Sequence, residues 1–129
     1  MTREPASHDE VVDATAQAEA NMRTQTVPVN VYETADAIVV VAPLPAVTAS
    51  VVTIEFSDNC LRFWAALRSA APRQYLVREW DYGGYEREVV LPDGYGRAVE
   101  ASLGNGQLAI RVLRGGGANP ISVKPTGLG

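Results

Sequence analysis

The chain has 129 residues, 47% of them hydrophobic, and a formal net charge of −4, which fits one globular domain with terminal segments left over. The acidic balance argues against a general nucleic-acid binder, and no apolar run approaches the roughly 20 residues that a membrane span requires. No apolar signal segment begins the chain, and Cys60 is the only cysteine, which excludes an internal disulfide. We therefore expect a cytoplasmic protein with no nucleic-acid partner and no membrane span.

Three regions differ in composition. Residues 1–26 are polar and acidic, and a capping box at Ser7–Glu10 predicts a marginal helix or a disordered arm. Residues 27–114 carry β-branched and aromatic runs that turn residues interrupt about every ten positions. Residues 115–129 are rich in glycine and proline, which predicts a flexible C-terminal extension.

The central region is predicted to consist of short strands. Alternation is clearest in residues 51–57, where Val52, Ile54 and Phe56 are separated by Thr53 and Glu55. The predicted strands cover residues 27–33, 37–44, 51–57, 60–67, 75–80, 85–92, 97–103 and 107–113. Because no helix pattern interrupts them, they predict an all-β fold, a β-sandwich of antiparallel sheets.

The firmest local prediction is a tight hairpin at Gly104-Asn105-Gly106. Asn-Gly readily adopts the positive φ angles that a two-residue hairpin turn requires. Alternation on both sides of the turn then places apolar side chains opposite one another in the sandwich interior. This inward set comprises Val99, Ala101 and Leu103 before the turn and Leu108, Ile110 and Val112 after it.

The residues that usually carry catalysis or metal binding are scarce. His8, the only histidine, lies in the N-terminal region, and Cys60 begins a predicted strand, so core residues supply neither a metal cluster nor a nucleophilic triad. Glu86 and Glu88 share one strand face, where solvation explains them better than acid–base chemistry. No glycine-rich nucleotide motif is present. We therefore expect no enzyme activity, no metal and no cofactor.

Aromatic residues are interleaved with arginines between residues 62 and 97. A sheet face of this kind would be able to stack single-stranded bases, but glutamates on the same strands weaken its positive field. Core and interface aromatics with compensating ion pairs are the favoured interpretation.

Four features in chain order resemble the small heat shock protein family and its α-crystallin domain. Residues 27–47 resemble the opening strand pair, with Ala46 in place of the glycine of a Leu-Pro-Gly-Val corner. Residues 75–94 resemble an arginine-rich strand, a glycine turn and a strand that ends in Leu-Pro. Residues 101–108 match the Ala-x-x-x-Asn-Gly-x-Leu hairpin, and Ile121-Ser122-Val123 resembles the C-terminal Ile-x-Ile/Val anchor.

The resemblance implies an immunoglobulin-like sandwich of two antiparallel sheets that forms a homodimer and then larger oligomers. The anchor, Ile121 and Val123, is expected to enter a groove at a sheet edge of a neighbouring subunit. The groove residues are predicted to be Val52, Ile54, Val99, Ala101 and Leu103. The strand at 75–80 matches the one that bacterial and plant members exchange between subunits, and the sequence leaves open whether exchange takes place here. Arg87 is expected to face a carboxylate at the subunit interface. The predicted dimer-interface residues are Tyr75, Leu76, Val77, Arg78, Trp80 and Arg87.

In function, the resemblance implies an ATP-independent holdase chaperone that binds partly unfolded client proteins and prevents their aggregation. Residues 1–26 depart from the family because they contain no phenylalanine, so we expect a smaller assembly and weaker client capture through this region. The alternative is a non-chaperone, co-chaperone-like docking module on a similar sandwich. Such a module would be a monomer with one native partner.

Overall fold

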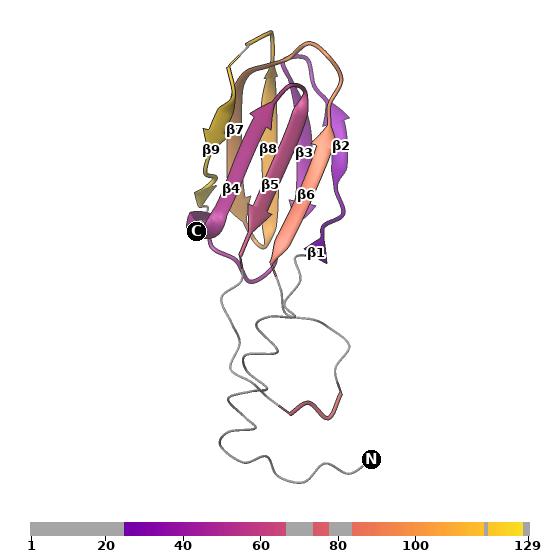
Figure 1. The fold of residues 1–129 in the computed structure, drawn as a ribbon, viewed down its shortest axis with the longest axis vertical. Coiled ribbons are helices and arrows are strands. Elements are labelled where there is room, and N and C mark those ends of the chain that lie inside the picture. Colours follow the sequence, from indigo (N-terminus) through magenta and orange to yellow (C-terminus); the bar gives the residue numbers. More distant parts are fainter. Residues whose placement is uncertain (1–24, 67–73, 78–83, 118, 128–129) are drawn as a thin grey trace.

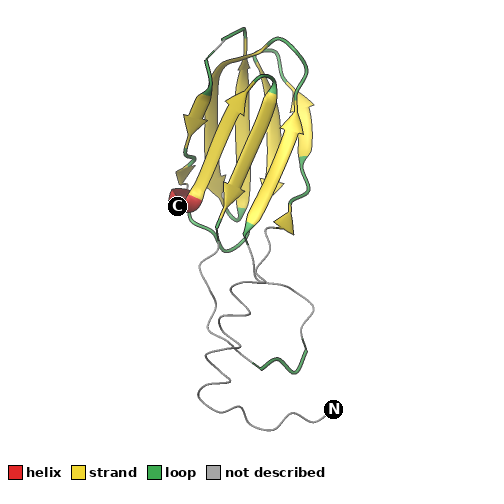
Figure 2. Ribbon diagram, in the orientation of Figure 1, coloured by secondary structure: helices red, strands yellow, loops and turns green. Residues whose placement is uncertain are grey.

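The fold is a sandwich of two five-stranded sheets, with strand orders β1-β6-β5-β4-β9 and β10-β7-β8-β3-β2 (Figure 1). The computed structural model describes residues 25–66, 74–77, 84–117 and 119–127. Within these residues the only helix is a single 3-10 turn, η1 (Ala49–Val51), and strands make up most of the rest (Figure 2). The predicted all-β, immunoglobulin-like sandwich is confirmed.

The strand bounds follow the predicted runs closely in the central region. The strands of the first sheet are β1 (Gln25–Thr26), β4 (Val52–Ser57), β5 (Cys60–Ala65), β6 (Tyr85–Val90) and β9 (Ile121–Val123). The strands of the second sheet are β2 (Asn30–Glu33), β3 (Ala37–Pro43), β7 (Tyr95–Gly104), β8 (Gln107–Arg114) and β10 (Thr126–Gly127).

Alternating side chains build one hydrophobic core between the sheets. In β4, Val52, Ile54 and Phe56 are buried, whereas Glu55 between them is exposed. The facing strand β8 contributes a second buried row, whose middle member, Ile110, has 0% exposed surface. Each such aliphatic side chain stabilises the fold by roughly 1.5–3 kcal/mol relative to exposure, so the period-two pattern determines which face of each sheet turns inward.

The predicted hairpin joins β7 and β8. Asn105 and Gly106 have φ angles of 53° and 73°, which are the paired positive angles of a tight two-residue turn. The predicted inward rows also meet as expected: the register pairs Leu103 with Leu108, Ala101 with Ile110 and Val99 with Val112.

Each open side of the sandwich is bridged by a segment that gives a short strand to both sheets. On one side β1 pairs with β6 and β2 pairs with β3, and Val27, between β1 and β2, is buried in the core. On the other side β9 pairs with β4 and β10 pairs with β7, and Pro125, between them, is buried. The two ends of the described chain thus connect the sheets at opposite sides.

Ala46 occupies the corner between β3 and β4 where the resemblance predicts glycine. Its φ angle is 65°, in the left-handed region where a Cβ atom costs roughly 1–2 kcal/mol. The neighbouring Leu44 N–H donates to Gly106 O at 2.7 Å, which ties this corner to the β7–β8 hairpin. The sequence therefore departs from the family pattern at a position whose backbone favours glycine.

The predicted strand at residues 75–80 is not formed in its described part. Tyr75, Leu76 and Val77 belong to no sheet, and Figure 1 draws them away from both sheets. Leu76 and Val77 are 103% and 72% exposed. A strand outside a sheet is at best marginally stable in water, which agrees with the absence of strand structure in these three residues. Arg78, Trp80 and the predicted N-terminal helix lie outside the described residues.

Candidate functional site: the groove beneath the C-terminal tail

The edge of the first sheet at β4 carries the tail strand β9. Ile121 lies opposite Phe56, and Val123 lies opposite Ile54, in an antiparallel register. Directly opposed residues place their side chains on the same face of a sheet, so Ile121 and Val123 turn inward with their buried partners. Ser122, between them, is exposed. Val123 also packs against the hydrophobic core.

The structure brings the predicted anchor and the predicted groove together. Val52 and Ile54 on β4 have 0% exposed surface, and Leu103 on β7 has 6%. Val99 and Ala101 on β7 are half-buried and pack against the same core. Because these side chains are apolar, the contact of the tail with this part of the sandwich rests mainly on burial of hydrophobic surface, together with the strand pairing to β4.

In the single chain the tail pairs with β4 of the same molecule, and the expected docking on a neighbouring subunit stays a prediction. Residues 115–120 link β8 to β9, and their glycines allow a close crossing. Gly115 N–H donates to Gly94 O at 2.8 Å. A Cβ atom on Gly117 would lie 2.9 Å from Gly96 O, nearer than such atoms approach. This contact with the start of β7 directs the short linker to the adjacent β4 edge.

A polar contact follows the tail strand. Lys124 Nζ donates to Ser50 O at 3.1 Å, to Val52 O at 3.3 Å and to Thr53 Oγ1 at 3.5 Å. Pro125 is then buried, and β10 pairs in parallel with β7. The tail is consequently attached at three successive points, which are β4, the η1 turn and β7.

Three of these features were not predicted from the sequence, namely the contributions of Phe56, Lys124 and β10. Phe56 had a usable signal, because it continues the inward alternation of Val52 and Ile54 towards the tail. Lys124 is the only lysine in the chain and directly follows the anchor, and this isolated position is the signal that the sequence offers for its contact. The two residues of β10 carry no strand signal, since Thr126–Gly127 is too short for periodicity.

The outer face of the first sheet carries a charged cluster around Arg62. Its guanidinium lies 4.3 Å from the ring centroid of Trp64 and makes salt bridges to Glu86 at 2.9 Å and to Glu88 at 3.7 Å. The hydrogen bonds that Arg62 donates to the Glu86 carboxylate are the main reason that the pKa of Arg62 is raised. Glu86 and Glu88 thus compensate the charge of Arg62 and Trp64 stacks against it, in agreement with the favoured interpretation.

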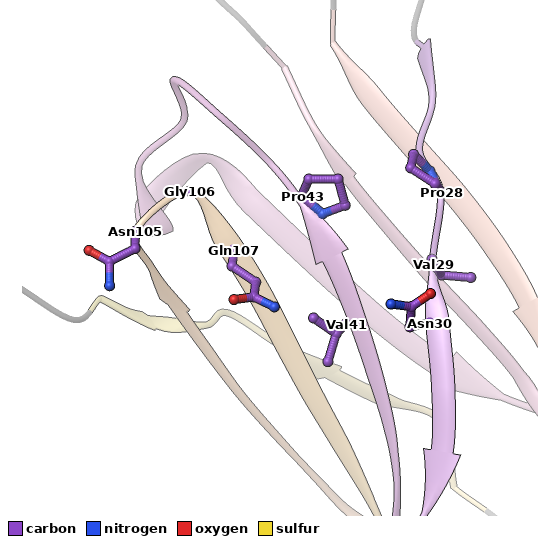
Figure 3. A pocket seen from close by; sticks show the side chains of 8 residues that line it. All are labelled: Pro28, Val29, Asn30, Val41, Pro43, Asn105, Gly106 and Gln107. Carbon is purple, nitrogen blue, oxygen red and sulfur yellow. The ribbon is translucent and has the colours of Figure 1, made fainter.

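A shallow hollow of about 430 Å³ lies on the second sheet beside the β7–β8 hairpin (Figure 3). It is lined by Pro28, Val29, Asn30, Val41, Pro43, Asn105, Gly106 and Gln107. None of these eight side chains ionises between pH 2 and 12, so the hollow offers no acid–base or nucleophilic chemistry.

Strand β2 is the outermost strand of the second sheet. All four of its residues are exposed, including Val31 at 42% and Tyr32 at 53%. One side of β2 pairs with β3, and no described strand pairs with the other side. An edge of this kind is a template for strand addition by another chain.

Arg87, the remaining predicted interface residue, lies on β6 opposite Phe63. Its Nη1 donates to Val27 O at 3.2 Å, so the half-buried guanidinium has a backbone acceptor within the chain. The expected carboxylate of a neighbouring subunit stays a prediction.

No group of three or more His, Cys, Asp or Glu side chains in the described part of the chain is arranged to hold a metal ion. Among the same residues, no helix has the length and apolar character needed to cross a membrane.

The profile of the Hsp20/alpha crystallin family matches residues 30–124, from β2 to the residue after β9. The chain belongs to this family. In this small heat shock protein, the residues that match the family profile include the β7–β8 hairpin and the tail strand. No curated protein matches the chain significantly.

Solved structures of small heat shock proteins share the fold. The hspA protein of Xanthomonas axonopodis is similar with a TM-score of 0.64 and 23% identity, over 71% of this chain and 96% of that chain. A small heat-shock protein from Xylella fastidiosa, described as having a distinct high order structure, has a TM-score of 0.63 and 20% identity, over 77% of this chain and 94% of that chain. HSP18.5 from E. histolytica has a TM-score of 0.62 and 17% identity, over 74% of this chain and 94% of that chain.

Proposed function

We propose that this protein is an ATP-independent holdase chaperone in the cytoplasm, which binds partly unfolded proteins and slows their aggregation without catalysis. The observation that supports the proposal is the seating of a short tail beside apolar side chains, with β9 paired to β4 and β10 paired to β7. Partly unfolded clients expose apolar segments and unpaired strand edges. Such a segment would be able to replace β9, because it offers the same strand pairing and the same alternate apolar side chains.

The cover is suited to reversible release. Ile121 and Val123 are only half-buried, so each contributes less than the roughly 1.5–3 kcal/mol of a fully buried aliphatic side chain. The strand pairing with β4 spans three residues. A client segment that is longer and more apolar than β9 would compete effectively for the groove.

We further propose a homodimer that uses the exposed edge of β2. Its free side would accept the strand predicted at residues 75–80 of another copy, with Tyr75, Leu76, Val77, Arg78 and Trp80 at the interface and Arg87 nearby. Two observations support this arrangement: β2 ends its sheet, and Leu76 and Val77 are exposed in the single chain. Larger oligomers would then form when tails exchange between dimers.

Aggregation of a model client tests the chaperone proposal. A disulfide-containing client is reduced, without ATP, in the presence of substoichiometric to equimolar full-length protein. We expect light scattering to fall with increasing protein. Unchanged scattering over that range would refute the holdase function. A monomer by native mass spectrometry, with one saturable native partner, would favour the docking-module alternative.

Involvement of the groove is tested by a variant pair in the same assay. Replacing Ile121 and Val123 with glycine should accelerate client capture, because it weakens the cover. The matched control is Ser122→Ala, which alters the exposed residue between them and should leave capture unchanged. Equal capture rates for the two variants would remove the groove from the proposal.

A further inference from the structure

The tail carries the only lysine of the chain, whereas the other ten basic residues are arginines. Lys124 directly follows β9, and its side chain is exposed although its amine is engaged. Nζ reaches Ser50 O at 3.1 Å, Val52 O at 3.3 Å and Thr53 Oγ1 at 3.5 Å. One ammonium group therefore joins the tail to three acceptors at the start of β4.

The acceptors explain why a cation is bound there. Ser50 lies in η1, and carbonyl groups at the end of a helical turn have no partner within that turn. Basic side chains stabilise such carbonyls, but the last turn of η1 contains no basic residue of its own. Lys124 supplies the missing donor from the tail, which makes closure of the tail dependent on an amine in its charged form.

We propose that Lys124 is a latch whose acylation releases the tail from the groove, so that it is a regulatory modification site. The acyl donor is an activated ester of the thioester class. After Nζ loses a proton, it attacks the thioester carbonyl carbon, the C–N bond forms, the C–S bond breaks, and the departing thiolate takes up a proton. The product amide is neutral and keeps one N–H, where the ammonium had three.

The chemistry couples modification to opening of the tail. An ammonium group that donates to three acceptors has no free electron pair, so Nζ reacts only after the tail has lifted and the amine has lost its proton. The acylated side chain then satisfies one acceptor at most, and the tail does not close as firmly. The effect on client binding rests on the proposed chaperone function, whereas the latch itself does not.

The test uses the full chain and two amine reagents. Acetyl N-hydroxysuccinimide ester neutralises Lys124, whereas reductive methylation keeps its positive charge. Hydrogen exchange with mass spectrometry then follows the backbone amides of Ile121–Val123. We expect acetylation to accelerate their exchange roughly tenfold, the effect of losing about one charge-assisted hydrogen bond. Methylation also leaves Nζ a single N–H but keeps its positive charge, so we expect a smaller acceleration than after acetylation, and the difference measures the contribution of the charge. Unchanged exchange after acetylation would overturn the latch.

Three controls make the result specific. Lys124→Arg leaves only the α-amine to react, so acceleration in this variant after acetylation would refute the role of Lys124. The interior strand β3, which pairs on both sides, should keep its protection from exchange. Loss of that protection would show general unfolding instead of tail release. Lys124→Gln should reproduce the acetylated protein without any reagent, and wild-type exchange in this variant would count against the latch. Faster tail exchange without holdase activity would refute the proposed function and leave the latch standing.

Discussion

The crossing of the tail over the start of β7 yields a sharp prediction about Gly117. A Cβ atom at this position would lie 2.9 Å from Gly96 O, and the obstructing atom belongs to the backbone. The backbone has little freedom to move, because Gly115 N–H is bonded to Gly94 O at 2.8 Å beside it. Overpacking of this kind costs roughly 1–3 kcal/mol. Gly117→Ala should therefore raise the open fraction of the tail by a factor of roughly 5–150.

Gly116→Ala is the matched control, because a Cβ atom on Gly116 would meet nothing within 4 Å. Both variants add one methyl group to the same linker and lower its flexibility alike. Hydrogen exchange of the Ile121–Val123 amides should accelerate in Gly117→Ala and stay near wild type in Gly116→Ala. Equal exchange in the two variants would show that the crossing does not hold the tail, and would refute the reasoning.

Three further predictions concern the corner, a surface carboxylate and the anchor. Ala46→Gly should raise the free energy of unfolding by roughly 0.5–1 kcal/mol in urea titrations, because the relief of backbone strain at φ 65° outweighs the entropy that glycine adds to the unfolded chain. The control Ala66→Gly, at an exposed position, should lower the free energy of unfolding. Asp36 has a pKa below its usual value near 3.8, because Thr34 donates to it and Arg111 lies beside it. Its stabilising effect is therefore present above pH 3.8 and is lost as the pH falls through the lowered pKa. The melting temperature of Asp36→Asn should accordingly lie below that of the wild type at pH 7, and the two melting temperatures should coincide in stronger acid. Glycine at both Ile121 and Val123 should convert any larger oligomers to dimers by native mass spectrometry, and an unchanged mass distribution would contradict the proposed tail exchange.

Local chemistry made much of the fold predictable. The Asn105-Gly106 turn and the alternation beside it determine the β7–β8 register, because both depend on residues that are adjacent in sequence. The anchor was expected from the family resemblance; Ile121 and Val123 lie in β9 opposite Phe56 and Ile54, and their role in docking on another subunit stays a prediction.

Contacts made with backbone carbonyl oxygens were not predictable from the sequence. Arg87 binds Val27 O, and Gly117 approaches Gly96 O, but a carbonyl oxygen is present at every residue and leaves no mark in the sequence. The sequence also leaves open the chain to which the tail binds. Its pairing with β4 requires the same side chains whether the tail comes from the same molecule or from a neighbour.

That equivalence has a consequence for assembly. Because a tail exchanged between two copies would make the same β9–β4 contacts, Ile121 and Val123 strengthen both connections equally and do not choose between them. The balance between closure on the same chain and exchange with a neighbour instead depends on the linker and on the protein concentration. A short tether holds the tail near its own groove at an effective concentration of about millimolar, so exchange prevails only where copies are crowded or the crossing at Gly117 is obstructed. We therefore expect the glycines between β8 and β9 to influence the balance between tails that close on their own chain and tails that bind a neighbouring copy.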